Sequence, residues 1–358
     1  MGLLLMMALM ALVGCAGDDK PETAGGDTPV AITFRCSVEE PLNYSATRAT
    51  NGHEGIMDKA ELYATGFGVF ATQRAANGPD LMYNQRLTFN FVGDLEDPLK
   101  GYWTYAPQKY WPTDVASTRF CAYAPYVELP LADGGTTEGI IGMSSNTETT
   151  PYIIYRRPLH PETCVDVMWS YNSPTAIAPL TMTMRHALAR IRVSVTLTSA
   201  LAANTKLLVK KITLSGTTVK KAKLLLNTAG NIPAWTEQET ESRTIVIDSN
   251  PTNADSYGIV AEEVRYQPDL PYAWQPQGLE KDVTAEALST LDRSAFIYLI
   301  PQTEQRLSCK LTCCLVGSDG SLTTFTKTAG GDIRFPADES KAFEGNTTYH
   351  LNLKIALP

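Results

Sequence analysis

The sequence predicts an all-β protein with two β-sandwich domains in tandem. Short segments in which apolar and polar residues alternate occur along most of the chain, and this period of two is typical of strands with one buried face. Clusters of Gly, Pro, Asn and Asp separate the segments, for example at residues 77–80 and 317–320. Long helical patterns are absent from the sequence, so we expect packed sheets rather than βαβ units.

The expected strands begin after residue 30 and continue to residue 355. The strongest pattern covers residues 189–197 and predicts a strand with one core face and one solvent-exposed face. Residues 134–151 lack a clear pattern and are expected to form a long loop, whereas residues 279–291 have a moderately helical composition without an apolar stripe. The expected strands are residues 32–38, 87–91, 119–123, 165–167, 189–197, 207–214, 244–247, 296–300, 307–316 and 347–355.

Length and composition indicate the domain organisation. The chain has 358 residues, a hydrophobic fraction of 44% and a net charge of −8, which favours globular cores and argues against a nucleic-acid binder. A chain of this length predicts two domains of about 150 residues each. We expect a signal segment at 1–15, a flexible tether at 16–30, and β-sandwich domains at 31–200 and 201–358.

The first residues indicate export. Met1 to Val13 is an apolar run that is too short to cross a bilayer, which takes about 20 residues, but has the length of a signal-peptide core. Cys15 follows Val13-Gly14 as in a bacterial lipobox, in which the cysteine is lipidated and becomes the mature N-terminus. The alternative is an ordinary cysteine of a signal peptide. Asp18-Asp19 resembles the acidic signal that takes some lipoproteins to the outer surface of the outer membrane, or it is a solvated tether.

Six cysteines follow Cys15, and their spacing is not that of a small disulfide scaffold. Within the strand expected at 307–316, Cys309 and Cys313 share the apolar face and Cys314 points the other way. No histidine lies near them, so buried thiols are favoured over a metal site. We expect no metal.

Motifs for catalysis are missing from the sequence. The four histidines, at 53, 160, 186 and 350, are widely spaced, and neither a Gly-x-Ser-x-Gly elbow nor a phosphate-binding glycine loop occurs. We therefore expect no enzyme and no cofactor, and His186 is interpreted as a hydrogen-bonded structural residue. The aromatic segment around Trp103 and Trp111 is the best candidate for ligand contact, because flat aromatic faces stack on sugar rings. The alternative is that both tryptophans pack in a core.

Several phrases, taken in order over residues 30–355, resemble the fimbrillin-like family of Gram-negative anaerobes, which are subunits of type V pili. This resemblance implies two transthyretin-like, Greek-key sandwich domains, export as a lipoprotein and processing by an arginine-specific protease. It also implies that processing removes the first strand, whose place a strand of a neighbouring subunit takes. The phrases are TRAT at 47–50, FGVFA at 67–71, WTYAP at 103–107, YWP at 110–112, FCAYAPY at 120–126, HALARIRV at 186–193, LIPQ at 299–302 and FEGNTTYHLNL at 343–353.

The sequence contains the parts that this mechanism needs. Residues 32–38 form a removable first strand, and residues 39–51 are polar and turn-prone, with Arg48 in the middle. Arg48 is the expected processing site, since Arg35 lies inside the strand. The alternative is that Arg48 is a loop arginine in a subunit that is never cut.

The leading interpretation is a structural or tip subunit of a surface pilus that contributes to adhesion. The sequence stops soon after the strand expected at 347–355, so either that strand is itself mobile and donated or the subunit only accepts a strand. We favour a subunit that only accepts, as a tip subunit would, whereas one that keeps its lipid would serve as the anchor. The expected partners are other pilus subunits, the protease, the outer membrane through the lipid, and surface ligands. One alternative is a permanently lipid-anchored protein that binds glycans or host ligands. Another is a secreted β-sandwich hydrolase with paired carboxylates.

Overall fold

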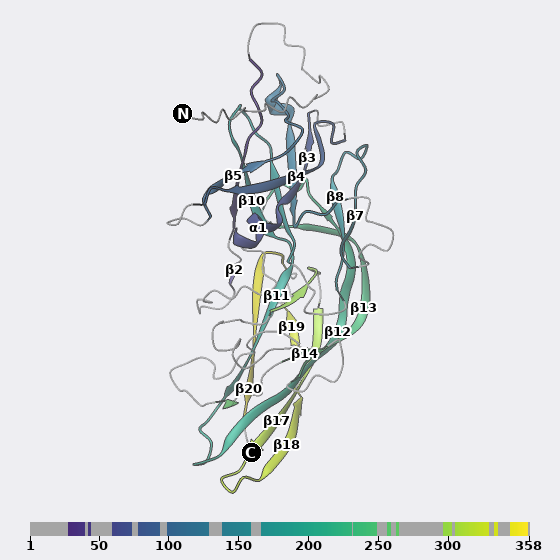
Figure 1. Cartoon of the computed structure of the whole chain (residues 1–358). Coiled ribbons are helices and arrows are strands. Elements are labelled where there is room, and N and C mark those ends of the chain that lie inside the picture. Colours follow the sequence, from purple (N-terminus) through teal and green to yellow (C-terminus); the bar gives the residue numbers. More distant parts are fainter. Residues whose placement is uncertain are drawn as a thin grey trace, which may run out of the picture.

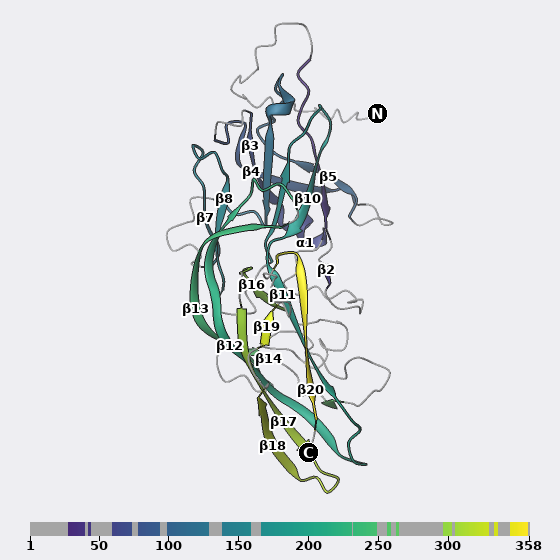
Figure 2. The same ribbon diagram turned by 180° about the vertical axis from the view of Figure 1, so that it is seen from behind.

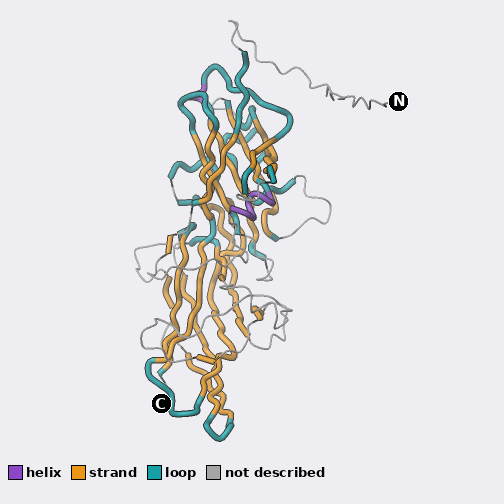
Figure 3. Tube along the Cα trace, turned by 60° about the vertical axis from the view of Figure 1, so that its left-hand side comes forward, coloured by secondary structure: helices purple, strands orange, loops and turns teal. Residues whose placement is uncertain are grey.

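In the computed structural model the chain is nearly all-β, as the sequence predicts. The helical segments among the described residues are the short helix α1 (Lys59–Thr65) and a 3-10 turn (Val115–Ser117). Figure 3 shows how far strands dominate the trace. The structure describes residues 28–39, 42–43, 59–73, 78–93, 99–128, 138–158, 166–230, 232–248, 256–258, 263–264, 296–302, 305–328, 333–335 and 344–356.

A seven-stranded sheet occupies one end of the elongated molecule (Figure 1). The first strand of the chain is at its edge and runs parallel to its neighbour, whereas all other neighbours in this sheet are antiparallel. In spatial order the strands are β1 (Phe34–Val38), β10 (Leu180–His186), β9 (Met168–Asn172), β6 (Arg119–Ala124), β3 (Phe67–Thr72), β4 (Met82–Phe91) and β5 (Gly101–Thr104).

A four-stranded sheet lies toward the other end. Its two long strands, β11 and β20, are parallel, and the register runs from Ala189 opposite Thr347 to Leu197 opposite Ile355. Both strands have the end residues that the sequence predicts. In spatial order this sheet contains β16 (Phe296–Leu299), β11 (Ala189–Leu197), β20 (Thr347–Ile355) and β2 (Leu42–Asn43).

A nine-stranded sheet connects the two ends. Its antiparallel strands β12 (Lys206–Leu225) and β13 (Ala234–Asp248) extend from the far tip of the molecule up to the seven-stranded sheet (Figures 1 and 2). The other strands are β14 (Ser256–Gly258), β15 (Glu263–Val264), β17 (Gln305–Val316), β18 (Leu322–Thr328), β19 (Ile333–Phe335), β7 (Gly139–Met143) and β8 (Tyr152–Arg156). Four of them, β8, β14, β15 and β17, pair with β12 or β13, while β7 pairs with β8, and β18 and β19 pair with β17.

Three clusters of buried side chains hold these sheets together. The N-terminal core covers one face of the seven-stranded sheet and includes Val69 of β3, while the middle core covers the other face and includes Phe70. This is why β3 is buried on both sides. The C-terminal core lies between the four-stranded sheet and the first half of β12. The second half of β12 contributes Val219 and Leu224 to the middle core, so β12 belongs to two cores.

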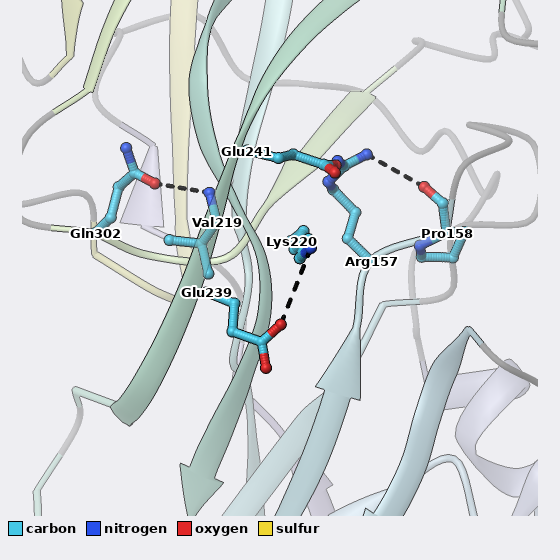
Figure 4. A network of polar contacts seen from close by, with 7 residues as sticks. All are labelled: Arg157, Pro158, Val219, Lys220, Glu239, Glu241 and Gln302. Atoms are coloured by element: carbon cyan, nitrogen blue, oxygen red, sulfur yellow. Dashed lines mark hydrogen bonds and ion pairs between the residues drawn. The ribbon is translucent and has the colours of Figure 1, made fainter.

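A polar network surrounds the irregular part of β12 (Figure 4). Val219 lies at a register shift in the pairing of β12 with β13, and between the stretches of β12 that pair with β17 and with β8, and its N–H takes a side-chain partner. This partner is Gln302, whose Oε1 accepts from Val219 N at 2.9 Å. Nearby, Arg157 is paired with Glu241, and its Nη1 donates to the carbonyl of Pro158 at 3.3 Å. These contacts satisfy buried polar groups where β8 joins β12.

Several elements were not among those expected from the sequence, including helix α1 and the strands β5, β7, β8, β10 and β18. Helix α1 places Leu62 and Tyr63 in the N-terminal core and ends at Gly66, whose positive φ of 75° is typical of a helix C-terminus. Strand β7 lies inside the segment expected to be a long loop, and it pairs with β8. The strand expected at 165–167 is replaced by β9, which begins at Met168.

The outer face of β11 is not solvent-exposed as predicted. Its described polar residues Arg190 and Thr196 are only 4% and 8% exposed. Both faces of β11 are therefore covered at these positions. This strand lies before residue 200, yet it contributes to the C-terminal core. Strands β7 and β8 also lie before residue 200, yet they belong to the sheet of β12, with β8 paired to β12 and β7 paired to β8.

Candidate functional site at the first strand

Strand β1 lies at the edge of the seven-stranded sheet, next to β10. The parallel register places Phe34 opposite Leu180. Backbone hydrogen bonds mark both ends of the pairing. Leu180 N donates to the carbonyl of Thr33 at 2.8 Å, and Glu39 N donates to the carbonyl of Met184 at 2.8 Å. Because β1 has a strand neighbour on one side only, its removal would leave one edge of β10 unpaired.

The side chains of this segment alternate between core and solvent, as predicted for residues 32–38. Ile32 and Phe34 are buried in the N-terminal core, and Cys36 and Val38 are partly buried against it. Arg35 and its neighbours on the other face are exposed. Each fully buried large apolar side chain stabilises the folded state by roughly 1.5–3 kcal/mol, so the segment is held mainly by its apolar face.

The ring of Phe34 makes specific aromatic contacts. Its centroid lies 5.5 Å from that of Tyr105 and 6.1 Å from that of Phe120, and both pairs are edge-to-face. Such pairs contribute about 0.5–1.5 kcal/mol beyond their buried area. This position therefore suits a large aromatic side chain.

A polar clamp holds the N-terminal end of the segment. The Tyr105 hydroxyl donates to the carbonyl of Ile32 at 2.9 Å, and Gln108 Nε2 lies 3.1 Å from the same oxygen. Gln108 Nε2 also donates to the Tyr105 hydroxyl at 2.8 Å, and Ile32 N donates to the carbonyl of Lys109 at 2.9 Å. Burial raises the pKa of Tyr105 to about 12, so its hydroxyl remains a donor at neutral pH.

An ionic contact holds the C-terminal end. Glu39 Oε2 lies 2.7 Å from Arg185 Nε, at the end of β10. The other carboxylate oxygen, Oε1, accepts from Asn346 Nδ2 at 3.4 Å. Asn346 immediately precedes β20, so Glu39 lies where β1 ends and β20 begins. We call the edge of β10, the clamp residues Tyr105 and Gln108, and Arg185 together the β1 site.

The chain then crosses to the second sheet. Strand β2 pairs in parallel with the start of β20, with Leu42 opposite Thr347 and Asn43 opposite Thr348. β2 thus forms an outer edge of the four-stranded sheet. One N-terminal segment therefore supplies an edge strand to each of two sheets.

The two tryptophans of the aromatic segment lie in or beside the N-terminal core. Trp111 is 6% exposed and contacts Phe120, with 5.7 Å between ring centroids. Trp103 is partly buried, 4.7 Å from the ring of Phe67. This placement favours packing over ligand contact. The exposed aromatic side chain of the segment's first strand is Tyr102, at 60%.

The structure describes some of the other residues for which the sequence predicts a role, but not all of them. Cys15, Arg48, Cys164 and residues 279–291 lie outside the described residues. Arg35 is inside β1, paired in register with Thr181.

The remaining chemical candidates are buried. Nδ1 of His186 contacts a carboxylate oxygen of Asp166, and both side chains are buried, in agreement with a structural role. Cys309 and Cys313 share the C-terminal core as predicted, and Cys314 is also buried. The described cysteines are free thiols. Across the described ranges, no group of three or more His, Cys, Asp or Glu is placed to hold a metal ion, and no helix is long and apolar enough to cross a membrane.

Sequence reasoning identified β1 but not the residues that hold it. Glu39, Arg185 and Gln108 had no distinguishing pattern, because the contacts join positions that are far apart in the chain. The one available signal was the acidic residue that directly follows an alternating strand.

The similarity of this chain to known proteins agrees with this architecture. The sequence model of a family described as fimbrillin-like matches residues 47–356, most of the chain. The chain belongs to the fimbrillin-like family. The match begins after β2, so both β1 and β2 lie outside it.

Two individual proteins illustrate the relationship to other fimbrillin-like and fimbrial proteins. The fimbrium subunit Fim1C of Phocaeicola vulgatus is 28% identical over 162 residues, which are 43% of this chain and 37% of that protein. The match thus spans well under half of that relative. The crystal structure of a fimbrial protein from Bacteroides vulgatus has a similar fold, with a TM-score of 0.53 at 19% identity, over 91% of this chain and 95% of that one.

Proposed function

We propose that this chain is a structural or tip subunit of a cell-surface pilus, assembled by strand exchange and contributing to adhesion. Its membership of the fimbrillin-like family and its similarity to a fimbrium subunit support this function. The observation that carries the mechanism is the placement of β1. It is an edge strand at the start of the chain, yet its inner side chains are part of the N-terminal core.

Loss of β1 would strongly favour the binding of another strand in its place. The N–H and C=O groups along the edge of β10 would lose their partners, and the apolar residues that Ile32 and Phe34 cover would be exposed to water. A strand from another subunit satisfies both needs. Its backbone restores the ladder and its side chains refill the core.

Cleavage after Arg48 is the proposed trigger. Arg48 lies in the segment between β2 and α1, so one cut there separates both edge strands from the rest of the chain. An arginine-specific protease is the partner for this step. The start of the family match at residue 47 supports a division of the chain at this point.

Before cleavage, the subunit is proposed to be a lipoprotein. Lipidation of Cys15 would anchor it to the outer membrane, with Asp18-Asp19 directing it to the cell surface. We further propose that the two ends of the molecule are transthyretin-like Greek-key sandwiches. Because β11 belongs to the C-terminal core, the division between them is better placed before Ala189 than at residue 200.

The test is brief digestion of the folded chain with an arginine-specific protease, followed by N-terminal sequencing. The expected result is one cut after Arg48, with the remainder resistant and able to oligomerise or to bind a donor-strand peptide. The matched control is Arg48→Lys, which removes the recognised residue but keeps the charge. Cleavage that leaves an inert monomer would overturn the proposal and favour the permanently anchored surface protein.

A further inference from the structure

We propose that the β1 site holds its occupant through a backbone carbonyl and selects it by two side chains, an aromatic one and a carboxylate. The partner is then a strand of another subunit that runs parallel to β10, presents alternating apolar residues with an aromatic one at the position of Phe34, and carries an acidic group at the position of Glu39. This inference rests on the proposed strand exchange and specifies which strands it accepts.

The clamp holds one backbone carbonyl of the strand, and the side chains of the strand set its register. Tyr105 and Gln108 both contact the carbonyl oxygen of Ile32, at 2.9 and 3.1 Å. Every residue has a carbonyl, so the clamp recognises a position rather than a side chain. A slip by one residue would turn the polar face of the strand, including Arg35, into the core.

The aromatic position follows from packing. Phe34 is 6% exposed and lies edge-to-face with Tyr105 and Phe120. Tyr105 thus takes part in both the clamp and the aromatic contact. A strand in correct register therefore places its second core-facing side chain between these two rings.

The acidic position follows from Arg185. Its side chain is 18% exposed, and Nε lies 2.7 Å from Glu39 Oε2. If β1 leaves, this carboxylate leaves with it, and a partly buried guanidinium loses its counter-charge. An incoming carboxylate at the same position restores the pair, whereas a neutral residue does not.

The neighbourhood of Glu39 also limits how far the strand extends. Strand β1 pairs with β10 as far as Val38 opposite Met184. Strand β20 pairs with β11, the next strand of the chain, from Thr347 opposite Ala189. Asn346, directly before β20, already contacts Glu39. An occupant therefore ends or leaves the line of β10 just after its acidic residue.

The experiment uses the full chain with a site for a sequence-specific protease inserted after residue 48, so that it does not depend on natural processing. After nicking, the N-terminal segment is held only non-covalently. The probes are synthetic peptides with the sequence of residues 31–39, either unchanged or carrying Glu39→Gln or Phe34→Ala. Native mass spectrometry measures how much of each peptide replaces the resident segment.

We expect the Glu39→Gln peptide to bind about two- to five-fold more weakly than the unchanged peptide, and the Phe34→Ala peptide more weakly still. In an Arg185→Gln protein the Glu and Gln peptides should bind equally. A Tyr105→Phe protein should bind both more weakly without changing their ratio. The peptide series on the unaltered protein needs no protein variant to fold.

Equal binding of the Glu and Gln peptides to the unaltered protein would overturn this inference and leave strand exchange intact. Tighter binding of the Glu peptide than of the Gln peptide to the Arg185→Gln protein would also overturn this inference and leave strand exchange intact. Failure of every peptide to enter, the unchanged one included, would overturn strand exchange itself and the inference with it.

Discussion

Glu39 and Arg185 link the end of the first strand to the end of the strand beside it, with 2.7 Å between Oε2 and Nε. The same carboxylate contacts Asn346 at the start of β20. One side chain therefore joins the N-terminal segment to both ends of the molecule. Its contribution can be measured through Cys36, which lies three residues earlier in β1.

Glu39→Gln should loosen β1. Loss of a partly exposed ion pair costs about 0.5–1 kcal/mol, which raises the open fraction of the strand about two- to five-fold. Cys36 is partly buried, and burial raises the pKa of its thiol to about 12, so its alkylation is slow while the strand is closed and faster when it opens. Peptide-level mass spectrometry should show Cys36 alkylated two- to five-fold faster. The same change at exposed Glu128 is the control, and an unchanged Cys36 rate in Glu39→Gln would contradict the role of the pair.

Phe34→Ala should destabilise the uncut protein strongly. Truncation of a buried Phe costs about 3–5 kcal/mol, because the space between Tyr105 and Phe120 stays unfilled. Urea unfolding measures the loss. Arg35→Ala, one residue away on the exposed face, should change the free energy of unfolding by less than about 0.5 kcal/mol. Similar losses for both variants would show that β1 is not held by its inner face.

Gln302→Ala should weaken the junction between the cores. The variant leaves the buried Val219 N–H without an acceptor, which costs about 1–3 kcal/mol. Hydrogen exchange should show faster exchange at Val219 together with a lower free energy of unfolding. Truncation of the exposed Gln73 to Ala serves as the comparison. Protection of Val219 that survives in Gln302→Ala would mean that another group satisfies it.

Gly345→Ala should disturb the start of β20. A Cβ there would lie 2.5 Å from the carbonyl oxygen of Ala187 and 2.3 Å from Cγ of Pro233, so the backbone has to move. Overpacking of this kind costs about 1–3 kcal/mol. Gly142→Ala is the matched control, because its nearest contact is the flexible end of Ile154 at 3.3 Å. Thermal unfolding should separate the two variants, and equal melting temperatures would refute the close contact.

Alkaline pH should destabilise the fold through its buried thiols. Burial raises the pKa of Cys36 from 9.0 to about 12, and that of Cys121 likewise. Between these values the folded chain binds more protons than the unfolded chain, so the free energy of unfolding falls as pH rises above 9. Each such thiol contributes a slope of up to about 1.4 kcal/mol per pH unit.

Urea unfolding at pH 8, 9 and 10 measures this slope. Cys36→Ala should reduce it, while Ser37→Ala on the exposed face of the same strand should not. A slope unaffected by Cys36→Ala would mean that this thiol is already exposed in the folded chain.

Local patterns predicted the strands well where a strand is regular and flanked by turns. The bounds of β11 and β20 follow from their alternation alone, since both carry unbroken apolar rows that reach the C-terminal core. Strand β7 escaped prediction because a bulge between Ile140 and Gly142 breaks the period of two. Helix α1 is too short to be stable on its own and depends on packing of Leu62 and Tyr63.

Contacts between segments that are far apart in the chain could not be predicted from the sequence. The apolar face of residues 32–38 predicted a strand but not its neighbour, because a period of two fixes a face and not a partner. The position of Glu39 beside Arg185 depends on the parallel pairing of β1 with β10. Likewise, Arg190 is polar and lies on a regular strand, so its alternation predicts an exposed side chain and its burial depends on the tertiary structure.

The long strand β12 has a mechanical consequence. Its first half packs in the C-terminal core and its second half in the middle core, with β13 paired along most of its length. A pull along the long axis of the molecule therefore shears a row of hydrogen bonds together instead of peeling them apart one at a time. Along this strand the two ends share one pair of strands, so tension applied at one end is transmitted to the other through β12 and β13.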